Sequence, residues 1–170
     1  MQRHLFLVLF IFALTVIPSR SFSITGGDAA PQFELSDLQG GKHSLADYLG
    51  KVVLINFWAS WCRECITEMP SLNTLYAQFS GQGLAVLGVT VDRKPEDARS
   101  AAKNAGIAFP ILLDIKGEVF IKKYAVIGLP TTIILDRKGI VREILIGTQD
   151  FLKKERKDKM ASLLKEQCIQ

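Results

Sequence analysis

The chain has 170 residues, of which 48% are hydrophobic, and this is enough for one domain with a sizeable core. Its formal net charge of +4 is mild, and no basic run is interleaved with aromatic residues, so the sequence does not indicate a nucleic-acid partner. Three cysteines are too few for a disulfide scaffold, so any close pair among them needs its own explanation.

The first residues have the pattern of an export signal. The basic residue Arg3 precedes an apolar segment, residues 5–17, which is short for a membrane span. We predict that residues 1–23 are either a signal peptide, cut before Ile24, or a short uncleaved membrane anchor. Either alternative places residues 24–170 outside the cytoplasm.

The segment that follows predicts a small hairpin and a single helical turn. Apolar residues alternate over 33–38, a pair of glycines marks a turn, and residues 42–44 form the returning strand. Ser44 has the position of a cap for the helical turn at 45–49.

A buried strand then leads into a helix. Residues 52–58 are apolar except for Asn56, which indicates a central strand covered on both faces. From Cys62 onward the apolar residues recur at threes and fours, the spacing of a helix. Cys62 and Cys65 are therefore expected in the first turn of that helix.

Beyond residue 80 the pattern alternates between strands and helices. The predicted elements are a strand at 84–91, a helix at 92–104, a strand at 110–113, a helix at 117–124, a hairpin at 133–146 and a helix at 150–167. In the last helix we expect five apolar side chains to point inward: Phe151, Leu152, Met160, Leu163 and Leu164. This order predicts an α/β fold, with a central mixed sheet flanked by helices and right-handed crossovers between its parallel strands.

The two cysteines are spaced for a bridge within one helical turn. Positions i and i+3 lie about 5–6 Å apart at Cβ, close enough for a disulfide after small adjustments. Unpaired backbone N–H groups and the positive end of the helix dipole stabilise a thiolate at the helix start. We predict that Cys62 is the nucleophile in thiol–disulfide exchange and that Cys65 resolves the mixed disulfide.

Three other roles for such a pair fit less well. A haem-attachment motif needs a histidine after the second cysteine, where Ile66 stands. A zinc site lacks ligands, because the only histidines are His4 and His43, so we expect no metal and no cofactor other than the cysteine pair. A purely structural bridge would gain little by closing so short a loop.

The residues around this pair resemble the active site of thioredoxins. The segment W-A-S-W-C-R-E-C, the apolar strand before it and the later L-P-T-T carry the resemblance. The run A-P-Q-F-E-L-S-D-L-Q-G-G-K-H-S-L-A-D-Y-L-G-K-V-V-L-I-N-F-W-A-S-W-C, with E-M-P-S-L and G-L-P-T-T-I-I-L-D, is more closely similar to the TlpA/ResA-like branch of exported thioredoxins, over residues 30–147. It implies a thioredoxin-like domain over 24–170, with its core at 31–166, an N-terminal hairpin extension and a central αβ insertion at 95–113.

The same resemblance implies a function. Members of this branch are exported reductants, often membrane-tethered, that act on disulfides of partner proteins, notably in cytochrome c maturation, and receive electrons from an upstream thiol donor. Two alternatives remain: an oxidase or isomerase of the same fold, and a non-catalytic module that keeps the fold as a scaffold. A peroxidase fits poorly, because Ala59, Ser60 and Trp61 precede Cys62 where that signature has a threonine and a proline.

The resemblance also assigns roles beyond the pair. Glu68 matches a buried acidic residue that transfers a proton to or from the resolving thiol. Pro130 matches a cis proline facing the disulfide, and Leu129 before it offers backbone hydrogen bonds to a substrate strand. Trp61 is expected in the substrate-binding surface, and with Trp58 it is expected to shield the pair from water.

Two positions depart from ordinary thioredoxins. Asn56 stands where they have a buried aspartate, which removes any proton relay there and leaves that role to Glu68. Between the cysteines, Arg63 favours a thiolate and Glu64 opposes it, so the sequence sets no redox direction. The third cysteine, Cys168, is expected to be a passive thiol or one engaged between chains.

Overall fold

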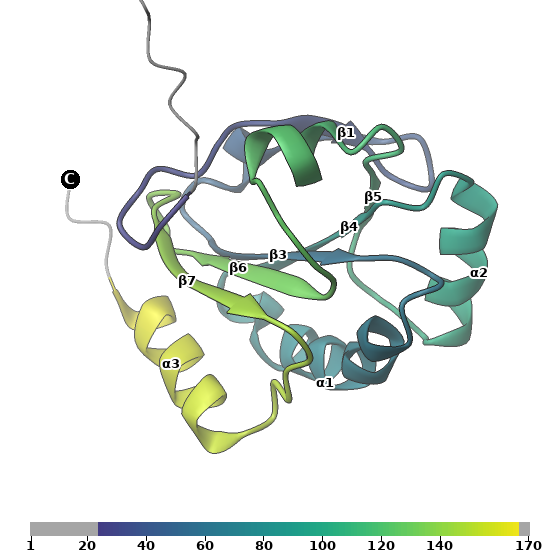
Figure 1. Ribbon diagram of the computed structural model, residues 1–170. Coiled ribbons are helices and arrows are strands. Elements are labelled where there is room, and N and C mark those ends of the chain that lie inside the picture. The colour runs from purple at the N-terminus through teal and green to yellow at the C-terminus, as the bar shows by residue number, and fades with distance from the viewer. Residues whose placement is uncertain (1–23, 167–170) are drawn as a thin grey trace, which may run out of the picture.

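The computed structural model describes residues 24–166 (Figure 1). The predicted export signal at 1–23 and the thiol of Cys168 lie outside the described residues. Within 24–166, no helix is both long enough and apolar enough to cross a membrane.

A five-stranded mixed sheet forms the centre, in the order β5-β4-β3-β6-β7. The middle strand β3 (Val52–Trp58) has β4 (Leu84–Thr90) parallel on one side and β6 (Thr131–Leu135) antiparallel on the other. At the edges, β5 (Ile111–Leu113) runs parallel to β4, and β7 (Val141–Ile146) runs antiparallel to β6. Every residue of β3 is buried, as predicted for a strand covered on both faces.

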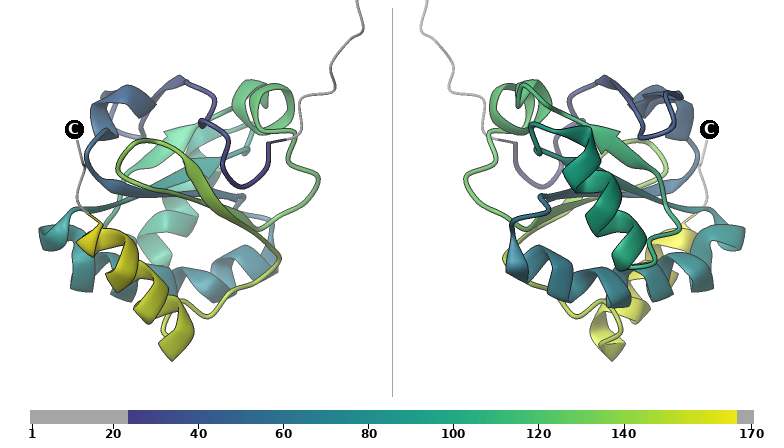
Figure 2. Two further views of the ribbon diagram at one scale, coloured as in Figure 1. Left: turned by 90° about the vertical axis from the view of Figure 1, so that its left-hand side faces the viewer. Right: turned by 90° about the vertical axis from the view of Figure 1, so that its right-hand side faces the viewer.

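One face of the sheet is covered by the three α-helices (Figures 1 and 2). Helix α1 (Arg63–Phe79) continues through Pro70, while α2 (Pro95–Asn104) and α3 (Lys154–Lys165) add their apolar side chains to the same core. Pro95 opens α2 at a position where its missing N–H costs no hydrogen bond.

Short elements cover the opposite face. They are the antiparallel hairpin of β1 (Glu34–Ser36) and β2 (Lys42–Ser44), the 3₁₀ turn η1 (Leu45–Tyr48), and η3 (Glu118–Lys123). Ser44 caps η1 through a capping box, as predicted. The helix predicted at 117–124 is present, but it is a single π-helical stretch rather than an α-helix.

Side chains along β3 alternate between two separate cores. Leu54 and Trp58 face α1 and α3, whereas Val53 and Phe57 face the short elements on the other side. Because side chains alternate along a strand, Asn56 shares the face of Leu54 and Trp58. A polar amide therefore lies in the middle of an apolar face, directly under α1.

The C-terminal helix is shorter than predicted. It begins at Lys154, and the residues before it form a turn. Phe151, Met160 and Leu163 are buried as expected, but Leu152 is 39% exposed. The prediction for Leu152 was wrong because this residue lies in the turn and not on the inward face of a helix.

Candidate active site

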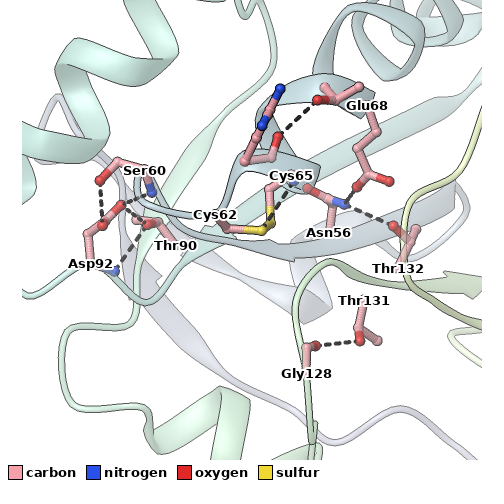
Figure 3. The surroundings of a disulfide bond; sticks show 12 residues. Asn56, Ser60, Cys62, Cys65, Glu68, Thr90, Asp92, Gly128, Thr131 and Thr132 are labelled. Atoms are coloured by element: carbon pink, nitrogen blue, oxygen red, sulfur yellow. Dashed lines mark hydrogen bonds between the residues drawn. A yellow bond between two sulfur atoms is a disulfide. The ribbon is translucent and has the colours of Figure 1, made fainter.

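The cysteine pair lies where β3 passes into α1 (Figure 3). Cys62 is the N-cap of α1, and its sulfur is bonded to that of Cys65 at 2.07 Å, with the two Cα atoms 5.3 Å apart. Cys62 is 6% exposed and Cys65 is fully buried. An incoming sulfur nucleophile or disulfide therefore meets Cys62 first.

The start of α1 supplies a hydrogen bond to the outer sulfur. The backbone N–H of Cys65 donates to Cys62 Sγ over 3.2 Å. This N–H is one of the donors that a helix leaves unpaired in its first turn. The same donor is positioned to stabilise a thiolate at Cys62 after reduction.

Glu68 lies one helical turn beyond Cys65 and is only 2% exposed. Its Oε1 accepts from Asn56 Nδ2 over 2.8 Å, and its Oε2 accepts from the backbone N–H of Gln149 over 2.9 Å. Burial raises the pKa of Glu68 from 4.5 to about 7, although both hydrogen bonds favour the ionised form. A carboxyl group with this pKa can both accept and release a proton near neutral pH.

Asn56 has a structural role that the sequence analysis did not predict. Its amide is fully buried, and Nδ2 donates both to Glu68 and, over 2.9 Å, to Thr132 Oγ1 on the neighbouring strand β6. The amide therefore fixes the orientation of the Glu68 carboxylate. Nothing in the sequence pairs Asn56 with Thr132, which lies 76 residues later.

A second buried carboxylate, Asp92, anchors the loop before Cys62. Its Oδ1 accepts from Ser60 Oγ over 2.8 Å, and its Oδ2 accepts from Ser60 N over 2.9 Å and from Thr90 Oγ1 over 2.7 Å. The sequence analysis assigned Asp92 to the start of a helix and missed this role. The sequence did contain a signal for it. Ser60 and Asp92 each follow a predicted buried strand, and the carboxyl ends of adjacent parallel strands meet at one edge of a sheet.

The loop before β6 reaches the disulfide from the far end of the sequence. The Leu129–Pro130 peptide bond is cis, the isomer that the resemblance implies. Thr131 Oγ1 donates to Gly128 O over 2.8 Å, and Gly147 N donates to Pro130 O over 2.9 Å. These bonds hold Leu129 in the wall of the same cleft that Cys62 lines.

The cleft beside Cys62 has a volume of about 540 Å³ and a largely apolar wall. Trp61, Leu129 and three isoleucines, Ile115, Ile121 and Ile127, line it. Ile127 is 89% exposed and Ile121 is 62% exposed, values that are high for large aliphatic side chains. The wall at 115–121 overlaps the short helix predicted at 117–124, but the sequence analysis did not predict its place in the site.

The two tryptophans near the disulfide differ in exposure. Trp61 is 72% exposed at the cleft, whereas Trp58 is fully buried in the core beneath the site. Most of the Trp61 side chain is therefore open to solvent at the cleft. Its position fits the predicted contact with a bound partner.

The structure thus brings the predicted site residues together. They are Cys62, Cys65, Glu68, Trp61, Leu129 and Pro130. Within residues 24–166 there is no group of three or more histidine, cysteine, aspartate or glutamate side chains that could hold a metal ion. The disulfide itself is the group in this site that can exchange electrons.

Comparison with known proteins gives a consistent result. A family model described as AhpC/TSA family matches residues 26–144. Thiol-disulfide oxidoreductase ResA of Geobacillus thermodenitrificans is 41% identical over 126 residues, covering 74% of this chain and 72% of the relative. The thioredoxin-like protein YneN of Bacillus subtilis is 40% identical over 144 residues, covering 83% of this chain and 82% of the relative. The crystal structure of a putative thiol:disulfide interchange protein DsbE from Chlorobium tepidum superposes with a TM-score of 0.78 at 32% identity, covering 84% of this chain and 99% of the other.

Proposed function

The chain belongs to the AhpC/TSA family and, within it, to the ResA-like thiol-disulfide oxidoreductases, and on this premise we propose that it reduces disulfides of partner proteins outside the cytoplasm. The predicted family and the predicted thioredoxin-like fold are confirmed. The observation that carries the proposed function is the asymmetry of the disulfide. Cys62 lines an open cleft, and Cys65 is buried behind it next to Glu68.

The exchange reaction follows from this asymmetry. In the reduced protein the Cys62 thiolate attacks a substrate disulfide, forming a mixed disulfide and releasing one substrate thiolate. Cys65 then loses its proton and attacks the Cys62 sulfur, which closes the Cys62–Cys65 bond and releases the second substrate thiolate. The protein loses two electrons and the substrate gains them.

Glu68 is the proposed carrier of the Cys65 proton. Because the pKa of Glu68 is about 7, its carboxylate can take this proton at neutral pH and afterwards return it to a leaving thiolate or to water. Burial places the carboxyl group in the same closed environment as Cys65, where bulk water cannot accept the Cys65 proton directly.

The cleft is the proposed binding surface for the substrate segment around its disulfide. Exposed apolar side chains at Trp61, Ile121 and Ile127 suit a partner with apolar residues next to its cysteine. Leu129, ahead of cis Pro130, is the proposed source of backbone hydrogen bonds to an extended segment. Backbone hydrogen bonds do not depend on the side chains of the bound segment, so they are compatible with substrates of different sequence.

The cellular setting is part of the proposal and rests on the sequence. Residues 1–23 support export, with or without a retained membrane anchor, and a membrane-associated thiol protein is the proposed electron donor. The resemblance to the TlpA/ResA-like branch supports apocytochrome c as one substrate. An oxidase or isomerase is the alternative, and the reduction potential separates them: a value near that of strong oxidants, about −120 mV, would contradict a reductase.

Trapping with Cys65→Ser tests the proposal directly. Without the resolving thiol, the mixed disulfide on Cys62 cannot be released, so a covalent adduct with partner proteins should accumulate and disappear on addition of dithiothreitol. The matched control is the double variant Cys62→Ser/Cys65→Ser. Failure to form an adduct, or an equal yield in the control, would overturn the proposed role of Cys62.

A further inference from the structure

One buried acceptor next to the disulfide has no hydrogen bond. Asn56 is fully buried, yet its Oδ1 contacts no donor among residues 24–166. A buried polar atom that lacks a partner costs roughly 1–3 kcal/mol, which is why native structures contain few of them. Its location in the site makes this atom informative.

The orientation of the Asn56 amide is determined by its other contacts. Nδ2 donates to two acceptors, Glu68 Oε1 and Thr132 Oγ1. The reversed amide would set its oxygen against the ionised Glu68 carboxylate, which has no proton to donate, and would lose that bond. Oδ1 therefore lies on the other side of the amide, where it points toward Cys65 (Figure 3).

We propose that Asn56 Oδ1 accepts a hydrogen bond from the Cys65 thiol when the protein is reduced. Asn56 is then a positioning residue for the exchange reaction, and this inference rests on the proposed function. Cys65 Sγ carries no proton while it is bonded to Cys62, so the described disulfide form offers Oδ1 no donor from this side. Reduction adds two electrons, breaks the S–S bond and places a proton on Cys65.

The proposed bond ties the redox state to a buried polar contact. In the dithiol form, Oδ1 has a donor, and in the disulfide form it has none among the residues that the structure describes. Asn56 therefore favours the reduced protein. It also favours a protonated Cys65 while Cys62 attacks the substrate, because an amide oxygen stabilises a thiol and not a thiolate. When Glu68 takes the proton, Cys65 is free to close the disulfide.

The first test observes the thiol itself. In the variant Cys62→Ser/Cys168→Ser, Cys65 is the only cysteine, and its S–H stretching band can be measured by infrared spectroscopy. We expect a band displaced to lower frequency than that of a free thiol, and we expect the displacement to vanish when Asn56→Leu is added. A band at the position of a non-bonded thiol while Asn56 is present would overturn the proposal, whether or not Asn56→Leu folds.

The second test measures the redox equilibrium against a glutathione buffer. Asn56→Leu should lower the equilibrium constant for reduction by about tenfold, a shift of about 30 mV toward more negative potential. Thr132→Val is the matched control. It removes one bond from Nδ2 in both redox states and leaves Oδ1 in place, so its potential should equal that of the unmodified protein.

An unchanged potential in Asn56→Leu, or an equal shift in Thr132→Val, would contradict the proposal. Neither experiment uses a partner protein. Failure of the trapping experiment with Cys65→Ser would therefore count against the proposed function and would leave these two results standing.

Discussion

The two sides of the disulfide differ in burial and in polarity. Behind Cys65 lies a closed polar network, in which Asn56, Glu68 and Thr132 are each no more than 2% exposed and are joined by hydrogen bonds. In front of Cys62 lies an open cleft lined by large, exposed aliphatic side chains. Ile127 has the highest exposed fraction among them.

The difference separates two tasks of one reaction. Proton transfer depends on fixed distances and a dry environment, which only buried and mutually bonded groups provide. Recognition of a partner depends on apolar contact area that can adapt to different sequences. Substitutions of the buried network should therefore change pH dependence and stability, and those of the exposed side chains in the cleft should change binding alone.

The largest effect is expected from Glu68, as a dependence of stability on pH. Because its pKa is about 7 in the folded protein and 4.5 when unperturbed, the folded state binds the extra proton between these values. The stabilisation from the neutral carboxyl group is complete below pH 4.5 and is lost as pH rises through 7, by about 3 kcal/mol in total. Glu68→Gln should lack this loss.

Denaturant unfolding of the oxidised protein at several pH values measures this dependence of stability on pH. The free energy of unfolding of the unmodified protein, minus that of Glu68→Gln, should fall across this pH range. Taking the difference cancels the other titrating groups. A difference that does not change with pH would show that burial behind Cys65 does not raise the pKa of Glu68.

A smaller effect, about 2 kcal/mol, is expected from Asp92→Ala. This change removes a buried acceptor of three hydrogen bonds and leaves Ser60 N–H and the Thr90 hydroxyl unpaired. Ser60→Ala, which loses only the hydroxyl contact, should cost about half as much. Equal stability of Asp92→Ala and the unmodified protein, measured by denaturant unfolding, would mean that the loop before Cys62 needs no buried polar anchor.

The smallest effect on the fold is expected in front of the disulfide. Ile127→Ser should change the free energy of unfolding by less than about 0.5 kcal/mol, because the side chain is almost fully exposed. It should nevertheless raise KM for a disulfide peptide with apolar residues beside its cysteine by about fivefold. Ile146→Ser is the matched control, since Ile146 is also exposed, at 63%, but does not line this cleft. Equal KM values for the two variants would remove Ile127 from the binding surface.

Features determined by local sequence could be predicted. An apolar strand followed by a helical repeat predicts that Cys62 stands at the start of α1, and Glu68 follows at the spacing that returns to the same helix face as Cys65. The hairpin of β6 and β7 and the cap at Ser44 are likewise determined by residues close together in the sequence. These elements agree because propensity, spacing and tertiary packing favour the same structure.

The contacts that complete the site join segments far apart in the chain. Asp92 meets Ser60 across 32 residues, and Thr132 meets Asn56 across 76. A single sequence records neither strand order nor register, so the pairings of Asp92 and Asn56 could not be derived from it. The cleft wall at 115–121 was missed for a related reason, since nothing local to that segment indicates that it lies beside Cys62.

The backbone N–H of Gln149 donates to the Glu68 carboxylate from a position 81 residues later. Ribosomal synthesis proceeds from the N-terminus, so Cys62 and Cys65 emerge long before this donor exists. A growing chain thus carries both cysteines before the buried carboxyl group beside them has all of its hydrogen-bond donors. Only when the last strand and the turn after it have been made and have packed against α1 does the Glu68 carboxyl group acquire all of its hydrogen bonds.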